Sequence, residues 1–318
     1  MFSFVSIYII YINKYTDIYI NNYKKYKVPI MQVTKNNLTI IIVTIKSHKV
    51  IDACLKSISP KIKKIIIENS TDQSFKNYLK KKYKNLECFI TKKNLGMGVA
   101  NNFGIKKSKT RYVMILNPDT RLRKNTLEKI YKISKNLNFS ILSPLSDNRK
   151  YPNYKNKKNT KNKIKDIGLI DVEQVDGYAM LLDKNKFQNK FFDENIFMYL
   201  ENDDLCLRTK KMKNKIFIYT KSLIYHLGAK AVDQKYKKEL ELSRNWHWNW
   251  SKFYFRKKHY GFISAFNNGI FVFIKSIIKS FYYLLILKNF KSKTYFFRAS
   301  GFVNALLGRK SWYRPKLD

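Results

Sequence analysis

The sequence predicts an α/β domain built around a mostly parallel sheet, followed by a helical region rich in aromatic and basic residues. In the first 120 residues, four short apolar runs alternate with segments whose apolar spacing is helical, which is the pattern of successive βαβ units. From about residue 244 this alternation stops, and residues 262–288 are almost continuously apolar. We therefore expect a doubly wound sheet first and helices after it.

Each predicted strand is an apolar run without the polar alternation of a half-exposed strand. Residues 38–45 (LTIIIVTI) are apolar and β-branched, as expected for a strand that is buried on both faces of a parallel sheet. Three similar runs follow: KKIIIEN at 63–69, LECFI at 86–90 and RYVMILN at 111–117. Residues 99–107 have helical spacing, and VDGYAMLL at 175–182 again resembles a strand.

Two boundaries divide the chain. Residues 1–37 open with an apolar run of twelve, which is shorter than the ~20 residues of a spanning helix, so we expect an N-terminal extension outside the fold. The main domain is expected at 38–243, with a solvated connection (KNKKNTKNKIK) near 155–165. The aromatic and basic helical region is expected at 244–318.

The apolar segment at 262–288 has three interpretations: a core helix, a spanning helix, or a helix that lies in the membrane interface. Lys275 and Lys279 stand four residues apart and share one helical face with Ser264 and Asn268. Phe, Ile and Leu fill most of the remaining circumference. This pattern favours the interface, although a polar stripe is also ordinary for a helix in a large core.

The composition is strongly basic, with 64 Lys and Arg against 22 Asp and Glu and a formal net charge of +42. Such an excess attracts anionic partners: nucleic acid, anionic lipid or phosphorylated ligands. A coding sequence rich in A and T explains the charge equally well. Lys, Asn, Ile, Phe and Tyr all have codons made largely of A and T, and all five are abundant here. The three cysteines lack C-x-x-C spacing, which argues against a disulfide framework or a zinc cluster and favours a reducing compartment.

Polar side chains follow three of the predicted strands, at the edge where an open α/β sheet binds its ligands. Thr44 ends the first strand, Glu68 and Asn69 follow the second, and Asn117 and Asp119 follow the fourth. Each alone is also an ordinary turn residue, but together they are suited to hold a ribose, a base and a metal. One carboxylate with substrate phosphates suffices for Mg²⁺ or Mn²⁺, so Asp119 implies a metal-bound diphosphate.

Two further segments carry polar motifs. Asn94 and Gly96 lie in NLGMG (94–98), which is a helix-start turn or a close approach to a nucleotide, and is neither a Walker loop nor a dinucleotide fingerprint. The strongest cluster is acidic, FDE at 192–194 and ENDD at 201–204. One interpretation is that these acids cap the N-terminus of a helix. The other is that they have a role in binding or catalysis, because neighbouring like charges are costly unless a cation or a function requires them. His226 follows another short strand, and its spacing alone favours a core histidine.

The order of these motifs from residue 38 to about 230 resembles the family 2 inverting glycosyltransferases, especially the rhamnosyltransferase-like branch that makes bacterial surface polysaccharides. The resemblance rests on Thr44, Glu68-Asn69-Ser70-Thr71-Asp72, Asn94-Leu95-Gly96, Asn102 with Gly104, Leu116-Asn117-Pro118-Asp119, Asp176-Gly177, Phe192-Asp193-Glu194, the acidic run to Arg208, and His226. It implies an A-type glycosyltransferase fold with a membrane-facing C-terminal helical region.

The resemblance also implies roles for these residues. Thr44 and Glu68 would lie near the base and ribose. The remaining residues expected around the nucleotide sugar are Asn69, Asn94, Gly96 and Asn117. Asp119 would bind the Mg²⁺ or Mn²⁺ on the diphosphate, joined by His226.

Two positions depart from the family pattern. Glu68 stands where the family usually has Asp, and Asn202 stands where it has the first Asp of Glu-Asp-x-Asp-Leu. An amide cannot accept the proton of an acceptor hydroxyl, so we predict that a neighbour is the catalytic base. Asp203 is favoured slightly over Asp204, which matches the second acid of the family and is also suited to orient the helix or bind the acceptor.

The expected activity is an inverting, single-displacement transfer of a hexosyl or rhamnosyl group from a nucleotide sugar to a lipid-linked saccharide. The enzyme is expected in the cytoplasm, peripheral on the inner face of the cell membrane and attracted to its anionic surface. No specific nucleic-acid partner is expected. The alternatives are a catalytically silent glycosyltransferase-like scaffold, motivated by Asn202, and a nucleic-acid-binding protein, motivated by the charge.

Overall fold

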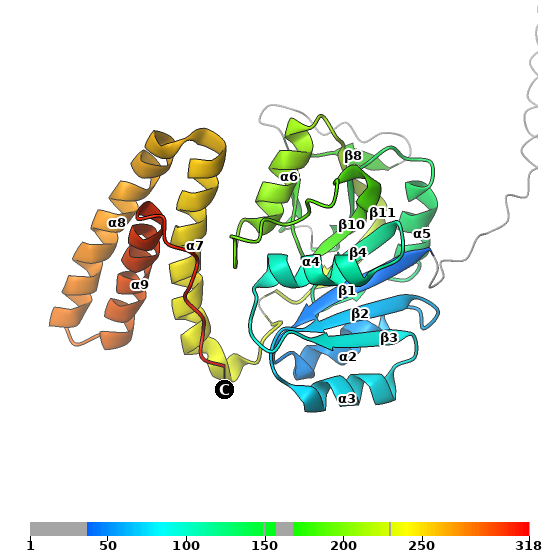
Figure 1. The fold of residues 1–318 in the computed structure, drawn as a ribbon, viewed down its shortest axis with the longest axis horizontal. Coiled ribbons are helices and arrows are strands. Elements are labelled where there is room, and N and C mark those ends of the chain that lie inside the picture. Colours follow the sequence, from blue (N-terminus) through cyan, green and yellow to red (C-terminus); the bar gives the residue numbers. More distant parts are fainter. Residues whose placement is uncertain (1–36, 149, 157–167, 229, 318) are drawn as a thin grey trace, which may run out of the picture. The chain divides into compact units, whose positions relative to one another are not determined.

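The computed structural model describes residues 37–148, 150–156, 168–228 and 230–317. The extension expected at 1–37 and the connection expected near 155–165 lie mostly outside these residues. The strands of the main sheet are β1 (Leu38–Thr44), β2 (Lys63–Glu68), β3 (Leu86–Ile90), β4 (Tyr112–Leu116), β5 (Thr120–Leu122), β6 (Ile141–Ser146), β8 (Leu169–Asp171), β10 (Ala179–Asp183) and β11 (Ile216–His226). Their order is β3-β2-β1-β4-β10-β6-β11-β5, and β8 also pairs with β11 (Figure 1).

The two halves of this sheet differ in strand direction. β1 to β4 pair in parallel, and their register places Thr44 opposite Glu68. In the other half β10 runs antiparallel to β4 and β6, while β11 is parallel to β6 and antiparallel to β5 and β8. The predicted α/β class with a mostly parallel sheet is confirmed, with antiparallel strands added after β4.

The strand expected at 175–182 is divided. Gln174–Val175 is β9, which pairs with β7 (Tyr154–Lys155) in a separate two-stranded sheet, and β10 begins only at Ala179. The three residues between β9 and β10, 176–178, belong to neither sheet. The polar Asp176 and the glycine at 177 therefore stand at the edge of the sheet and not inside a strand.

Helices cover both faces of the sheet. They are α2 (His48–Lys56), α3 (Gln73–Lys82), α4 (Met97–Lys107), α5 (Thr126–Ser134) and α6 (Glu201–Lys211), with 3₁₀ turns η1 (Lys184–Lys186) and η2 (Gln234–Tyr236). α2, α3 and α5 bury their apolar sides in one core layer, and α4 and α6 bury theirs in the other. All seven residues of β1 are buried, as its uninterrupted apolar run predicts.

The C-terminal region is a group of three helices, α7 (Lys237–Tyr260), α8 (Phe262–Leu285) and α9 (Asn289–Leu306), with α9 packed on both others. The expected limit between residues 243 and 244 falls inside α7. The three helices share a small core of their own around Trp246, Trp250 and Phe302. A Cβ on Gly301 would lie 2.1 Å from the carbonyl oxygen of Trp246, so glycine there lets α9 approach α7 closely.

α8 turns its apolar residues outward. It is long and apolar enough to cross a membrane by length and composition alone, yet only 11% of its most apolar window is buried. Its two fully buried residues are the small Ala265 and Ser276. Ser280 and Ser292 join α8 to α9, each hydroxyl donating to the carbonyl oxygen of the other residue at 3.0 and 2.8 Å. Two serines thus bond across the α8–α9 contact beside Phe273, which stacks on Phe302, while most other apolar side chains of α8 lie outside.

Candidate active site

The carboxyl ends of β1 and β2 bring a hydroxyl and a carboxylate together. The Thr44 hydroxyl donates to Glu68 Oε2 at 2.6 Å, and the Ser70 hydroxyl donates to Glu68 Oε1. Glu68 is buried, and burial raises the pKa of its carboxyl group despite these two hydrogen bonds. Both carboxylate oxygens are therefore held in place at the sheet edge predicted to bind a nucleotide.

Asn69 and Asn94 fix the loop that leads into α4. Asn69 Oδ1 accepts from the backbone N–H of Leu95 at 2.9 Å, and its amide donates to Asn94 Oδ1 at 3.0 Å. Asn94 Oδ1 also accepts from the Gly96 N–H. Gly96 has φ +84°, and a Cβ there would lie 2.3 Å from the carbonyl oxygen of Phe197. These three predicted site residues thus shape the backbone at the strand ends.

Asp119 and His226 meet beyond β4. β5 pairs with β11 so that His226 lies opposite Thr120, which brings the histidine beside the turn that carries Asp119. His226 Nε2 lies 3.4 Å from Asp119 Oδ1, and Asp119 Oδ2 accepts from the Lys230 N–H. Asp119 Oδ1 is buried and receives no hydrogen bond from any residue that the structure describes. His226, whose spacing fits either a core histidine or a metal ligand, thus lies next to the predicted metal ligand.

This pair fits a divalent cation that is bound jointly with substrate. A buried carboxylate oxygen without a hydrogen-bond donor is costly, and a metal would satisfy it. Asn117 Oδ1, on the same turn, is also buried without a donor among the described residues. Within those residues, no group of three or more His, Cys, Asp and Glu is close enough to hold a metal. The remaining ligands would come from phosphate and water, which is usual for Mg²⁺ and Mn²⁺ sites.

A second group of acids lies near His226. Burial and the charge of Asp203 both raise the pKa of Asp176, and the charge of His226 lowers it. Asp203, the predicted base, also has a raised pKa because it is buried. Its Oδ1 accepts from the Gln174 amide and lies 4.0 Å from Lys155 Nζ. Asp203 therefore has one oxygen engaged and lies within electrostatic range of Asp176.

Glu201 is a functional candidate that the sequence analysis placed in the acidic motif without giving it a role. It is the first residue of α6, and burial raises the pKa of its carboxyl group to about 7. Its Oε2 is buried with no hydrogen-bond partner among the described residues. Tyr199 and Leu200 before it have φ of 68° and 67°, a left-handed conformation that is costly outside glycine. The turn into α6 is thus a strained segment that ends on an unpartnered carboxylate.

The side chain of Asn202 is bound to the backbone of the loop before β10. Its amide donates to the carbonyl oxygen of Val175 at 3.1 Å, and a Cβ added to Gly177 would lie 3.3 Å from the Cβ of Asn202. A carboxylate in this position would face the Val175 carbonyl oxygen without a proton to donate. The departure from the family pattern therefore gives the amide a structural hydrogen bond.

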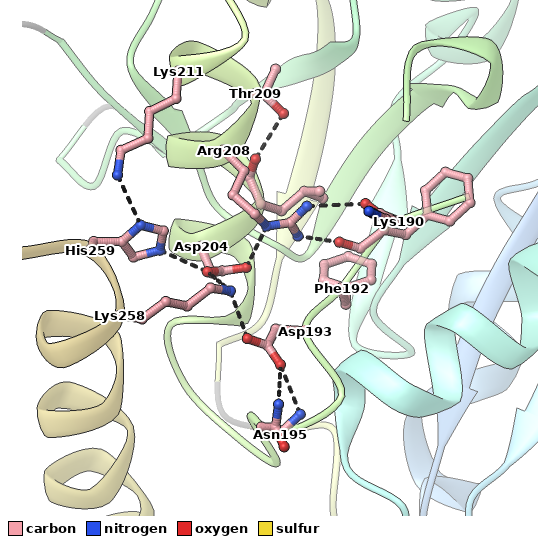
Figure 2. Close-up of polar contacts among 12 residues, drawn as sticks. Lys190, Phe192, Asp193, Asn195, Asp204, Arg208, Thr209, Lys211, Lys258 and His259 are labelled. Atoms are coloured by element: carbon pink, nitrogen blue, oxygen red, sulfur yellow. Dashed lines mark hydrogen bonds and ion pairs between the residues drawn. The ribbon is translucent and has the colours of Figure 1, made fainter. Parts of the chain in front are cut away.

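Asp204 is enclosed by two cations and a histidine. Its carboxylate accepts from Arg208 Nε at 2.8 Å, from Lys258 Nζ at 2.6 Å and from His259 Nε2 at 2.8 Å, as Figure 2 shows. Burial acts to raise the pKa of Asp204, but the hydrogen bonds from Lys258 and Arg208 outweigh it and lower the pKa. Lys258 also binds Asp193 at 2.6 Å. Asp204 thus anchors α6 to α7, and none of its contacts turns it toward the Asp119 site.

Several known proteins are similar to this chain. The hexosyltransferase Agl10 of low-salt glycan biosynthesis in Haloferax volcanii is 25% identical over 199 residues, which cover 57% of this chain and 64% of that protein. The chain thus spans less than two thirds of that relative's length. Among solved structures, GalNAc-T7 with UDP, GalNAc and Mn²⁺ gives a TM-score of 0.49 at 12% identity, covering 74% of this chain and 57% of the other. TarS of S. aureus gives 0.47 at 17% identity, covering 66% and 39%.

A family model matches most of the region that contains the sheet. The model described as glycosyl transferase family 2 matches residues 39–205, more than half of the 318-residue chain. The match begins in β1 and ends inside α6, so it includes Thr44, Glu68, Asp119 and Glu201. The chain belongs to glycosyl transferase family 2, and it is a glycosyltransferase with an A-type fold.

Proposed function

We propose that this enzyme transfers a hexosyl group, with inversion, from a nucleotide sugar to a saccharide carried on a lipid. The observation that carries the proposal is the meeting of Thr44–Glu68 and Asp119–His226 at one sheet edge, with the carboxylates of α6 nearby. A rhamnosyl donor and a role in surface polysaccharide synthesis are the finer expectations, and they rest on the motif resemblance alone.

The donor would bind by its two ends. Thr44 and Glu68 offer a fixed hydroxyl and carboxylate to the ribose and base. Asp119 and His226 would hold Mg²⁺ or Mn²⁺ through Asp119 Oδ1 and a ring nitrogen. When bound, the metal neutralises charge that develops on the leaving diphosphate.

The base of the reaction comes from the first turn of α6. In a single displacement the acceptor hydroxyl attacks the anomeric carbon, the bond to the diphosphate breaks, and the hydroxyl proton goes to a carboxylate. Glu201 is suited to take it, since its pKa of about 7 matches neutral pH and its Oε2 is free of hydrogen bonds within the described residues. Asp203, favoured from the sequence, is the alternative that the same variants test.

The helical region would place the enzyme on a membrane. α8 exposes Ile263, Phe281 and Leu285 at 75, 65 and 73% of their surface, while its small and polar residues face α9. An outward apolar stripe flanked by lysines is suited to the interface of an anionic membrane, here the inner face of the cell membrane. A lipid-linked acceptor would be presented at the same surface.

Donor hydrolysis by the purified chain, measured with Mn²⁺ and a panel of UDP-, GDP- and dTDP-sugars, tests the proposed activity. One donor should be hydrolysed, and calorimetry should show Mn²⁺-dependent binding of the corresponding nucleotide diphosphate. Asp119→Ala should weaken that binding by at least about tenfold, because the metal loses its charged protein ligand. If no donor is bound or hydrolysed, the silent scaffold suggested by Asn202 is correct. Undiminished metal-dependent affinity in Asp119→Ala would remove this residue from the site.

A further inference from the structure

A groove of about 440 Å³ runs between α7 and the α8–α9 pair, outside the donor site. Two aromatic rings mark one end of it. Tyr199, from the loop before α6, and Trp248, from α7, meet edge to face with ring centroids 5.5 Å apart. Trp248 is 46% exposed, so part of its ring is open to a ligand in the groove.

The aromatic rings adjoin the turn that carries the proposed base. Tyr199 lies two residues before Glu201, and Tyr199 and Leu200 both have positive φ. Burial raises the pKa of the Tyr199 phenol to about 12, while the charge of Arg244 lowers it and the charge of Glu201 raises it. The phenol therefore stands within electrostatic range of both the proposed base and a groove cation.

The groove is lined by three cations and one carboxylate. Arg244 and Lys252 form no ion pair with any residue that the structure describes, and Arg298 donates through Nε to the Asn245 side chain. The carboxylate is Glu241, whose Oε1 accepts from the Asn245 amide at 2.8 Å. The balance favours an anion with several oxygens, for which arginine and lysine are the usual partners.

The groove also reaches α8. Val272 lines the groove and is 39% exposed, and its neighbour Phe271 is 76% exposed. A ligand in the groove would thus meet a carboxylate, aromatic rings and cations, with an apolar surface next to them. That combination of surfaces matches a saccharide joined through phosphate to a lipid.

We propose that this groove binds the acceptor: Arg244, Lys252 and Arg298 hold its diphosphate, and Trp248 stacks on its first sugar. The acceptor's lipid lies along α8. The inference rests on the proposed transfer to a lipid-linked saccharide, and it assigns residues that neither the motif resemblance nor the family match covers.

The opposite face of α7 supplies a matched control. Arg244, Trp248 and Lys252 are spaced by four and share one face, whereas Lys257 is about 140° further around the helix from Lys252. Lys257 and Arg309 line a different cavity, of about 750 Å³, beside Trp250. Neither forms an ion pair with a described residue. The pair Arg244 and Lys252 and the pair Lys257 and Arg309 thus carry the same charge, but they differ in their position relative to Glu201.

Farnesyl diphosphate serves as the probe, because it carries the diphosphate and a lipid without a nucleotide. Quenching of tryptophan fluorescence in the full chain should report its binding. Arg244→Gln/Lys252→Gln should raise its Kd by about tenfold or more, since two charge-assisted contacts to the diphosphate are lost. Lys257→Gln/Arg309→Gln should change it by less than about twofold. The proposal would be overturned if both double variants lost the same affinity for farnesyl diphosphate, or if Arg244→Gln/Lys252→Gln lost none.

Two further arms separate the sources of the phosphate. Binding of UDP with Mn²⁺ should be unchanged in Arg244→Gln/Lys252→Gln; if it is lost, these cations serve the donor and the proposal fails. Binding to phosphatidylglycerol vesicles should fall equally in the two double variants, since both remove two surface charges. A loss confined to the groove variant would mean that the groove binds lipid headgroups and not the acceptor. Donor hydrolysis tests the proposed activity independently of all three arms.

Discussion

β1 and α8 are both apolar runs, and the structure treats them in opposite ways. All seven residues of β1 are buried between two helical layers, whereas α8 buries only Ala265 and Ser276 and turns Ile, Phe and Leu outward. The polar groups differ in place as well: in the sheet they lie at strand ends, whereas Ser280 and Ser292 bond to each other between α8 and α9. Apolar composition therefore predicts that a segment avoids water, but the arrangement of its neighbours decides whether protein or lipid replaces the water.

If this contrast is correct, the sheet region performs the chemistry and the helical region supplies attachment. The largest expected effect is on the chemistry. Glu201→Gln should lower kcat by about 10²–10⁴-fold, the usual contribution of a general base, with nucleotide binding and vesicle binding unchanged. Steady-state kinetics of Glu201→Gln beside Asp203→Asn would decide between the two carboxylates. A large loss in Asp203→Asn alone would assign the base to Asp203.

The next effect is on the contact between α6 of the sheet region and α7 of the helical region. Asp204→Ala should lower the free energy of unfolding by about 3 kcal/mol, because it leaves Lys258 and Arg208 without the buried carboxylate that pairs them. Urea denaturation would measure the change. Glu194→Ala, an acid on the loop beside this cluster whose contact is a single hydrogen bond from Asn102, should cost much less. Equal losses of unfolding free energy in Asp204→Ala and Glu194→Ala would show that the cluster around Asp204 does not stabilise the contact between α6 and α7.

The pH dependence should also belong to the sheet region. Glu201 must be unprotonated to act as a base, so kcat should fall about tenfold per unit as pH drops below the pKa of about 7, and level off above it. The effect on stability has the opposite sign: the folded state holds this proton more tightly than the unfolded state, so Glu201 should make the fold less stable as pH rises from about 4.5 to about 7. Glu201→Gln should remove the stability change. A profile that is flat from pH 6 to 8 in the natural enzyme would contradict this assignment.

The smallest effect concerns attachment alone. Ile278→Ser/Phe281→Ser should reduce binding to phosphatidylglycerol vesicles by roughly fivefold, since both side chains are exposed on the outward stripe of α8. Stability should change by less than about 0.5 kcal/mol, because neither residue is buried. Met212→Ser, an exposed apolar residue at the end of α6, is the control and should bind vesicles normally. Vesicle co-sedimentation and thermal unfolding measure the two quantities, and an unfolded double variant would place α8 in a protein core.

The sequence predicted the fold where the signal is local. β1 to β4 were found because an uninterrupted β-branched run has one stable position, inside a covered sheet. The strand expected at 175–182 begins four residues before the main-sheet strand β10, because nothing local to Asp176 and Gly177 distinguishes a turn at the sheet edge from a strand. The antiparallel direction of β10 depends on its pairing with β4 and β6, which are distant in sequence.

Site residues show the same limit. Asp119 was predicted because strand ends of an α/β sheet meet at one edge, and its closeness to His226 follows from the pairing of β5 with β11. The surroundings of the acidic run were not predictable, since Asp204 owes its ion pair with Lys258 to a residue 54 positions away. Burial without a partner, which marks Glu201, likewise depends on the packed structure and leaves no trace in the motif.

The single ammonium group of Lys258 has an evolutionary consequence. It bridges Asp193, on the loop before α6, and Asp204, on α6 itself, so replacing it alone would leave two neighbouring acids with only the Arg208 cation, which binds Asp204. Such a change costs least when Asp193 is replaced as well, and we expect positions 193 and 258 to vary together among homologues. For the same reason, a helical region grafted from another glycosyltransferase should function on this catalytic domain only if it brings its own cation to position 258.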